Sequence, residues 1–304
     1  MMVDLIKLDT EKNNQQTIDI DAVSTEEILR KINNEDKTVA SIVEESIGDI
    51  SILVDQIVDR MKVGGRLFYI GAGTSGRLGV LDAAECPPTY GVDKGLVVGI
   101  MAGGDNAMYT AQEGAEDSLE LAAKDLATYN LCEKDSVIGI AASGRTPYVI
   151  GGLRYARQVG ALTGTISCVK NAEISESADY PIEAVTGAEA IMGSTRMKAG
   201  TAQKLILNMI STSVMIKLGK VYKNYMVDVK ATNKKLVVRS KNMIRTLTGV
   251  DEERAELLYE QSGRSVKKAL VMEIMNVDRD TAEEALSKGD GHIKRAIQYL
   301  GGDV

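Results

Sequence analysis

The fold of this chain is decided by residues 66–79, which read RLFYIGAGTSGRLG. The stretch opens with a short apolar run, Arg66–Ile70, that is typical of a buried strand. It continues into a glycine-rich loop with two hydroxyls, Thr74 and Ser75, and then into a helical pattern. The free backbone N–H groups and the dipole at the start of a helix favour an anion. The stretch therefore predicts a strand, an anion-binding turn and a helix, with a plain hydroxyl-capped turn as the alternative.

Three more apolar runs of strand length follow along the chain. They are residues 96–101, 137–141 and 162–169, each separated from the next by a helical pattern. Alternating strands and helices predict an α/β fold with a parallel sheet covered by helices on both faces. Ligands bind such sheets in the loops that leave the carboxyl ends of the strands.

The remaining segments are mostly helical in pattern. Ser24 and Glu27 form a predicted capping box at the start of the first segment. Helices are expected over residues 24–62, 110–130, 195–219 and 227–247, with short helices starting near Asp251, Ser265, Asp280 and Asp290. We expect an N-terminal helical segment at 1–62, a main domain at 63–248 and a small helical domain at 249–304.

Composition excludes several classes of protein. The net charge of −7 argues against a nucleic-acid-binding surface, and no apolar run reaches the ~18 residues of a membrane span. The single histidine, His292, leaves a Ser-His-Asp triad or a His-rich metal site without candidates in the main domain. Three scattered cysteines predict a reducing, cytoplasmic location. Carboxylates, Lys, Arg or Tyr must then transfer any protons, and neither a metal nor a cofactor is expected.

The glycine loop does not fit a nucleotide site. Gly71, Gly73 and Gly76 satisfy G-x-G-x-x-G, but the next strand lacks an acidic residue at its end, since Asp105 comes late and in a loop. The Gly-Lys-Ser/Thr of an ATPase loop is also missing, because Gly76 is followed by Arg77.

A second loop repeats the hydroxyl-rich pattern. The third strand runs into residues 141–147, AASGRTP, where Ser143 and Thr146 offer hydroxyls and Pro147 suits the first turn of a helix. Two such loops at one sheet edge predict a phosphate held by hydroxyls and main chain.

This pair of loops resembles the sugar isomerase (SIS) domain, whose members bind phosphosugars. The resemblance implies a three-layer αβα sandwich with a five-stranded parallel sheet, usually dimeric. It implies a phosphate site at Thr74, Ser75, Ser143 and Thr146.

Two longer stretches narrow the resemblance. Residues 78–90, LGVLDAAECPPTY, and 187–204, GAEAIMGSTRMKAGTAQK, are similar to N-acetylmuramic acid 6-phosphate etherases and to the related glucokinase regulatory proteins. Ala188 stands where these proteins usually have proline, and the difference affects only a turn. The resemblance covers nearly the whole chain and implies that the C-terminal helices form a domain similar to ubiquitin-associated (UBA) domains.

The etherase resemblance implies a reaction and two catalytic residues. D-lactate is removed from N-acetylmuramic acid 6-phosphate by elimination and rehydration, in cell-wall amino sugar recycling. Glu85 is implied as the acid that protonates lactate and Glu116 as the base at C2, although which role each residue takes is left open. From the sequence alone, Glu85 could be an ordinary helix-end carboxylate before Pro87-Pro88, and Glu116 part of a solvated acidic helix face. A predicted capping box of Thr110 and Glu113 leaves Glu116 as the earliest free carboxylate of that helix.

The loop before the long apolar helix has two readings. Arg196 or Lys198 could face the lactate carboxylate or the phosphate, together with Ser194. Equally, Ser194 could cap the helix with the cations on its surface.

Two other functions stay open. An aldose–ketose phosphosugar isomerase would use the same domain but lack residues 85–90 and 187–204 of the etherase pattern. A non-catalytic phosphosugar-sensing regulator, like the glucokinase regulatory proteins, would have a longer chain with two sugar-binding domains. We expect a phosphosugar substrate and a homodimer.

Overall fold

The computed structural model describes residues 9–110, 112, 114–231 and 233–303 and divides the chain into two compact units. The first unit comprises the residues up to Ala84 together with Gly95–Ser211. The second comprises Glu85–Lys94 and the residues from Thr212 onward. The expected boundaries at 62 and 248 differ from this division and remain predictions.

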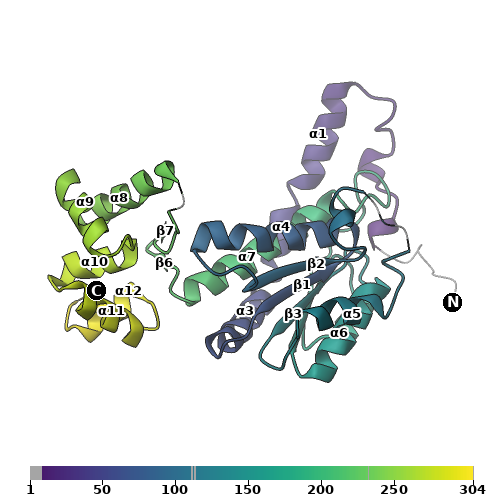
Figure 1. Ribbon diagram of the computed structural model, residues 1–304. Helices are drawn as coiled ribbons and strands as arrows, with labels where there is room; N and C mark the ends of the chain where they lie inside the picture. Colours follow the sequence, from purple (N-terminus) through teal and green to yellow (C-terminus); the bar gives the residue numbers. More distant parts are fainter. Residues whose placement is uncertain (1–8, 111, 113, 232, 304) are drawn as a thin grey trace. The chain divides into compact units, whose positions relative to one another are not determined.

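A five-stranded parallel sheet forms the centre of the first unit (Figure 1). Its order is β2-β1-β3-β4-β5, and every neighbouring pair is parallel. The strands are β1 (Leu67–Gly71), β2 (Val97–Met101), β3 (Ser136–Ile140), β4 (Leu162–Ser167) and β5 (Tyr180–Glu183). The four strands expected from apolar runs are confirmed within one or two residues at each end, and the α/β fold with a five-stranded parallel sheet is confirmed.

Helices cover both faces of this sheet, as Figure 1 shows. On one face, α5 (Leu121–Thr128) and α6 (Pro147–Val159) pack on Phe68 and Ile70 of β1. On the other face lie α3 (Ile47–Lys62) and the first part of α4 (Gly73–Tyr90), whose Gly79 lies against Tyr69. The start of α7 (Lys198–Lys217) packs beside α4. Alternation along β1 therefore builds the three layers, as side chains of one strand point to opposite faces.

The N-terminal segment is built from short helices. They are η2 (Asp9–Glu11), η3 (Gln15–Thr17), α1 (Thr25–Asp36) and α2 (Val39–Glu44). The predicted capping box is confirmed, because the Ser24 side chain accepts from Glu27 N and the Glu27 side chain accepts from Ser24 N. The segment is tied to the loop before α7 by the Thr17 hydroxyl, which donates to the Ala190 carbonyl at 2.8 Å. The helical pattern expected over residues 24–62 thus forms three separate helices, α1, α2 and α3.

The second unit is helical apart from one small hairpin. Its elements are the hairpin β6 (Val221–Tyr222) and β7 (Tyr225–Met226), followed by α8 (Lys234–Thr248), α9 (Glu252–Gln261), α10 (Val266–Met275), α11 (Arg279–Lys288) and α12 (Ile293–Tyr299). Asp251 and Ser265 cap α9 and α10 as predicted. The next helix starts earlier than predicted, because Asp278 caps it and not Asp280. Asp290 lies two residues before the cap of α12, His292.

His292 has a structural contact in this unit. Its Nε2 lies 3.0 Å from the Lys217 carbonyl oxygen at the end of α7, and burial lowers the pKa of the ring. The same unit holds an ion pair between the buried Lys267 and the half-buried Asp228, at 2.7 Å. Within the described residues, no helix has the length and apolar character needed to cross a bilayer.

One buried carboxyl lies between helices of the first unit. Asp82 of α4 is 7% exposed and accepts hydrogen bonds from Asn208 Nδ2 at 2.8 Å and from the Ser211 hydroxyl at 3.0 Å, both on α7. Burial raises the pKa of Asp82 above its ordinary value of 3.8, against the effect of these hydrogen bonds. The ionised carboxylate is thus less favourable here than in the unfolded chain.

This raised pKa predicts how stability depends on pH. The folded protein binds the Asp82 proton more tightly than the unfolded chain, so the resulting stabilisation is complete below pH 3.8 and is lost as the pH rises through the folded pKa. Asp82→Asn removes the titration. The unfolding free energy of Asp82→Asn minus that of the wild type should therefore increase from about pH 4 to 7 in urea denaturation. The exposed Asp21→Asn controls for loss of one negative charge, and a difference that is constant with pH would contradict the prediction.

Candidate active site

The carboxyl ends of three neighbouring strands bring the predicted loops to one edge of the sheet. Gly71 at the end of β1 pairs with Met101 of β2 on one side and with Ile140 of β3 on the other. The glycine loop, the loop after β2 and the second hydroxyl loop therefore start level with one another. This is the position at which parallel sheets bind ligands.

The glycine loop is held tightly against the sheet. A Cβ on Gly76 would lie 2.6 Å from the Gly71 carbonyl oxygen and 2.7 Å from Met101 Cβ, so only glycine fits there. Thr74 is half-buried in the first turn of α4. Ser75 is 7% exposed, and its hydroxyl donates to Gln203 Oε1 of α7 at 2.9 Å. In the first turn of α4, the Ser75 hydroxyl is thus already hydrogen-bonded to α7.

The second loop turns sharply into α6. Gly144 has φ +69°, and a Cβ there would lie 2.5 Å from Ala172 Cβ. Thr146 is the N-cap residue of α6, and Pro147 stands in the first turn as predicted. Within the described chain, the Thr146 side chain makes no capping hydrogen bond, and the buried Nε of Arg145 has no partner. Ser143, Arg145 and Thr146 all remain partly accessible, so their polar groups are available at this turn.

Glu116 lies in a loop, and the predicted helix over 110–130 is wrong for its first half. The helix α5 begins only at Leu121, and residues 114–120 form turns. The Glu116 carbonyl oxygen accepts from Tyr148 N, in the first turn of α6, at 2.9 Å. This bond fixes the main chain of Glu116 beside the second hydroxyl loop. Glu113, the partner in the predicted capping box, lies outside the described residues.

The Glu116 side chain lines a small pocket at the same edge. The pocket has a volume of about 170 Å³ and is lined by Ala72, Gly73, Arg77, Met101, Ala102, Ala107, Gln112 and Glu116. Arg77 of α4 holds the loop after β2 by donating to the carbonyl oxygens of Met108 at 3.0 Å and Ala107 at 2.7 Å. The structure therefore brings the first glycine loop, Arg77 and Glu116 to one pocket.

Comparison with known proteins identifies the family. The model of the glucokinase regulatory protein N-terminal SIS domain matches residues 49–157. An N-acetylmuramic acid 6-phosphate etherase of Clostridium botulinum is 58% identical over 96% of this chain and 97% of its own length. An etherase of the same name from Caldanaerobacter subterraneus is 55% identical over 97% of this chain and 96% of its own length. The chain belongs to the N-acetylmuramic acid 6-phosphate etherase family.

The resemblance to the etherase family read from the sequence is thereby confirmed. Among solved structures, phosphoheptose isomerase GmhA from Neisseria gonorrhoeae matches with a TM-score of 0.49 and 15% identity, over 63% of this chain and 98% of that chain.

The second glutamate implied by the etherase family, Glu85, belongs to the second unit. It is exposed on α4, which continues to Tyr90 with Pro87 and Pro88 inside it. The prediction that the two prolines stop the helix at Glu85 is therefore wrong. Each proline keeps a helical φ but lacks the N–H that would bond four residues back, so the last turn of α4 is held by fewer hydrogen bonds than the turns before it.

Lys198, in the longest stretch shared with the etherases, is buried. It is 5% exposed, and its ammonium lies 2.5 Å from Glu35 Oε2 of α1. The expectation that the cations lie on the helix surface is wrong for Lys198, although Arg196 is exposed. Ser194 is half-buried in the loop before α7. Ligand binding by Ser194 and Lys198 stays a prediction.

Glu189, which the sequence did not point to, caps α7. Its two carboxylate oxygens accept from Lys198 N and Ala199 N, each at 2.9 Å. The side chain is fully buried, and burial raises the pKa of this carboxyl. The alternative expectation that Ser194 caps the helix is therefore wrong. A glutamate nine residues before its helix lies outside every local capping pattern, so no signal in the sequence marks it.

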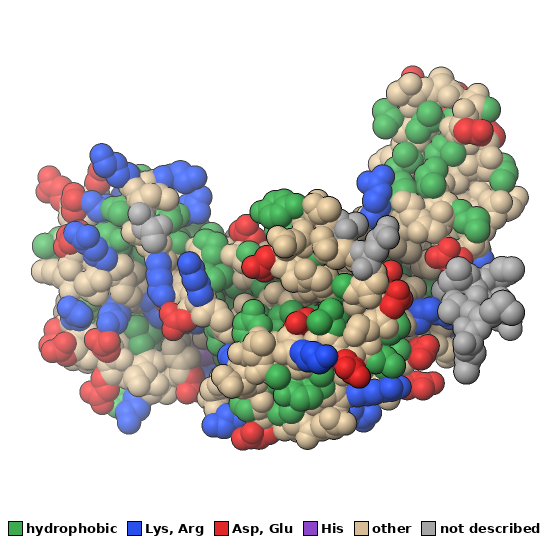
Figure 2. Space-filling model, turned by 45° about the vertical axis from the view of Figure 1, so that its right-hand side comes forward, with side chains coloured by type: hydrophobic (Ala, Val, Ile, Leu, Met, Phe, Trp, Pro, Cys, Tyr) green, Lys and Arg blue, Asp and Glu red, His purple; other side chains and the backbone are tan. Residues whose placement is uncertain are grey.

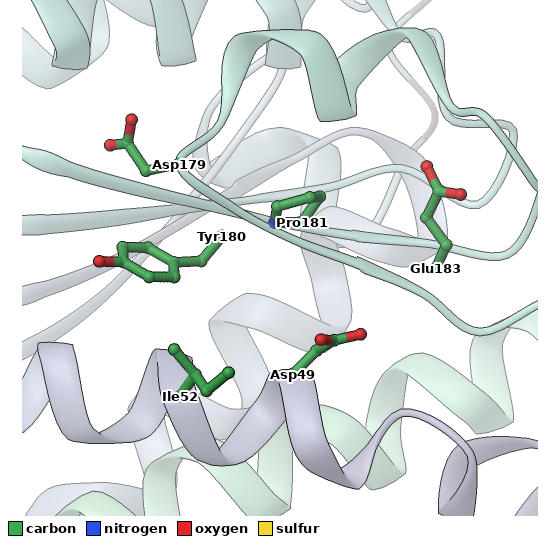
Figure 3. A pocket seen from close by; sticks show the side chains of 6 residues that line it. All are labelled: Asp49, Ile52, Asp179, Tyr180, Pro181 and Glu183. Carbon is green, nitrogen blue, oxygen red and sulfur yellow. The ribbon is translucent and has the colours of Figure 1, made fainter.

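A larger hollow of about 550 Å³ lies between α3 and the edge strand β5 (Figure 3). Figure 3 shows Tyr180 over Ile52, with the carboxyl groups of Asp179 and Glu183 on the strand side. Both of these carboxylates already have partners within the protein. Asp179 pairs with Arg157 at 3.2 Å, and Glu183 accepts from Asn171 N, Ala172 N and the Ser175 hydroxyl. The predicted loops lie elsewhere, so the candidate site remains at the carboxyl ends of the strands.

The described residues hold no cluster of three or more His, Cys, Asp or Glu side chains suited to bind a metal ion.

The Lys198–Glu35 contact predicts coupled effects on stability. Glu35→Gln or Lys198→Met alone leaves a largely buried charge without its partner and should lower the free energy of unfolding by about 3 kcal/mol. The double variant should lose clearly less than the sum of the two, as denaturation in urea would measure. Lys12→Met, at an exposed ion pair, is the control. If the two losses of stability simply add, the contribution of Lys198 to stability does not depend on Glu35. That result would favour a ligand-binding role for Lys198.

Proposed function

We propose that this protein cleaves the D-lactyl ether of N-acetylmuramic acid 6-phosphate, giving N-acetylglucosamine 6-phosphate and D-lactate. The observation that carries the proposal is 58% identity to a named etherase over almost the full length of both chains. The pocket that joins Glu116 to the glycine loop supports it, because it places a carboxylate beside an anion-binding helix start.

The phosphate of the substrate binds at the two hydroxyl loops. Thr74 and Ser75 stand in the first turn of α4, whose start offers free N–H groups, and Ser143 and Thr146 add hydroxyls just before or at the N-cap of α6. Hydroxyls and N–H groups together suit a dianion. The sugar then extends from this anchor toward Glu116.

Glu116 acts as the base at C2 of the open-chain sugar. The C2 proton is acidic because it is next to the C1 aldehyde, and the carboxylate removes it. The electron pair left on C2 forms a double bond to C3 as the C3–O bond to lactate breaks. The main-chain bond from Tyr148 N to the Glu116 carbonyl holds the residue in place without using its carboxylate.

Glu85 acts as the acid. It gives its proton to the ether oxygen as D-lactate departs, and water then adds at C3 while a proton returns to C2. No redox partner or cofactor is needed for this balance. The reaction is carbon–oxygen lyase chemistry with net hydrolysis, and it serves recycling of cell-wall amino sugars in the cytoplasm.

The proposal is tested by following whether oxygen from water enters the sugar product or the lactate. The purified protein should release D-lactate from N-acetylmuramic acid 6-phosphate in ¹⁸O-water with EDTA present. Mass spectrometry should find the label at C3 of the sugar and none in lactate, because the C3–O bond is the one that breaks. Label in lactate would contradict elimination. A protein that binds phosphosugars without releasing lactate would overturn the etherase proposal in favour of an isomerase or a regulator.

Two variants in the same assay separate the roles of the glutamates. Glu116→Gln should lower kcat by about 100-fold or more and stop exchange of the C2 proton with deuterated water. Glu85→Gln should lower lactate release to a similar degree while exchange at C2 continues. Glu120→Gln, an exposed carboxylate in the same segment, is the control and should behave as the wild type. Exchange that survives in Glu116→Gln would show that Glu116 is not the base.

A homodimer is part of the proposal. Helix α1 has 12 residues and none of them is buried, while Leu29 is 61% exposed. An isolated helix of this length is marginal in water without packing. Figure 2 shows hydrophobic side chains on the N-terminal part of the surface. A second copy of the chain fits this face, because α1 contacts its own chain through charged side chains, Glu35 with Lys198 and Lys31 with Asp19, and leaves Leu29 exposed.

The dimer proposal predicts a change in mass. The wild type should sediment at the mass of two chains, and Leu29→Glu should shift the protein toward one chain because it places a charge in the apolar face. Glu26→Gln, also exposed on α1, is the control. A wild type that sediments as a single chain would overturn the dimer, and a Leu29→Glu variant that stays dimeric would place the interface elsewhere.

A further inference from the structure

One buried amide lies directly behind the glycine loop. Gln203 of α7 is fully buried, and its Oε1 accepts the proton of the Ser75 hydroxyl at 2.9 Å. Its Nε2 is also buried and has no hydrogen-bond partner anywhere in the described part of the chain. The contact between the helices is close here, since a Cβ on Gly200 would lie 3.5 Å from Thr74 Cγ2.

This arrangement conflicts with phosphate binding by Ser75. A serine hydroxyl has one proton, and in this structure Gln203 receives it. Phosphate oxygens only accept, so Ser75 must take its proton away from Gln203 to bind them. If nothing else moved, both ends of the buried amide would then be unpaired, at a cost of about 1–3 kcal/mol for each group.

A half-turn of the amide removes the conflict. It places Nε2 where Oε1 was, so that Nε2 donates to Ser75 Oγ and Ser75 is free to donate to the phosphate. The amide then makes one bond as before and the hydroxyl makes two. The added bond is charge-assisted, and a donor chain of this kind is strengthened by mutual polarisation.

We propose that Gln203 is a positioning residue for the phosphate group of the sugar: its amide turns when the phosphate enters, and Nε2 then holds the Ser75 hydroxyl as a donor. This inference rests on the proposed function only in requiring that the glycine loop binds a sugar phosphate. It gives the unpartnered Nε2 a role, and it assigns to α7 an indirect part in binding, through Ser75, at a loop that belongs to α4.

The test measures binding separately from turnover. The probe is N-acetylglucosamine 6-phosphate, whose Kd is measured by calorimetry for the wild type, Ser75→Ala, Gln203→Met and the double variant. Methionine has nearly the shape of glutamine but no amide, so Gln203→Met should raise Kd about 10-fold, as expected for a lost hydrogen bond to a group that holds a charge. Gln158→Met, at an exposed glutamine of α6, is the control for the chemical change.

The double variant decides whether Gln203 acts through Ser75. If it does, Gln203→Met should add little to the loss already caused by Ser75→Ala, and the KM of the reaction should rise with little change in kcat. Independent, multiplying losses of affinity would overturn the inference, as would an unchanged Kd in Gln203→Met.

Gln203→Glu provides a second test in case Gln203→Met folds poorly. A protonated glutamic acid can donate to Ser75, whereas an ionised one only accepts and also repels the phosphate. Its Kd should therefore rise with pH more steeply than that of the wild type. A parallel pH profile would overturn the inference while leaving the etherase proposal intact. A wild type that binds no sugar phosphate would overturn both.

Discussion

The close approach of α4 to the end of β1 is the constraint on which the site depends. At Gly76 the backbone of the helix lies against the Gly71 carbonyl, and any Cβ there would lie 2.6 Å from that oxygen. One turn later, a Cβ on Gly79 would lie 2.9 Å from Tyr69 Cβ. Two glycines thus fix both the start and the direction of α4 on the sheet. Because the helix begins at once after the strand, Thr74 and Ser75 are placed in its first turn, where the N–H groups are free.

The same loop is supported from the other side by α7. This helix starts where the buried Glu189 carboxylate receives two of its N–H groups, and Lys198 links its first turn to Glu35. Burying these charges is costly, as the raised pKa of Glu189 indicates, and it is offset by hydrogen bonds that only one position of the helix provides. The position of α7 is therefore fixed, and Gln203 is held behind Ser75. The glycine loop is thus supported by a network of charged groups outside it.

The sheet could be predicted from sequence because its signals are local. Short apolar runs and glycine turns mark β1 to β4, and Asp251 and Ser265 mark two helix starts directly. The loop around Glu116 could not be predicted, because its Ala- and Glu-rich segment has a helical pattern, and a hydrogen bond from Tyr148 N holds it in another shape. The Lys198–Glu35 pair joins residues 163 positions apart, and Glu189 caps a helix nine residues away. Such contacts arise from tertiary packing, which no local pattern encodes.

The distribution of charge reverses what the sequence suggests. Lys198 and Glu189 stand in the stretch that resembles a ligand loop, yet their charges are taken up by contacts within the protein. Glu116 stands in what reads as a solvated acidic face, and in the described part of the chain its carboxylate has neither a hydrogen bond nor an ion pair. A base must leave its lone pairs to the substrate, so it is better held by its main chain than by its side chain. Exposure of Glu116 beside the start of α4 is therefore what the proposed proton abstraction requires, and the buried contacts of Glu189 and Lys198 hold α7 behind that helix start.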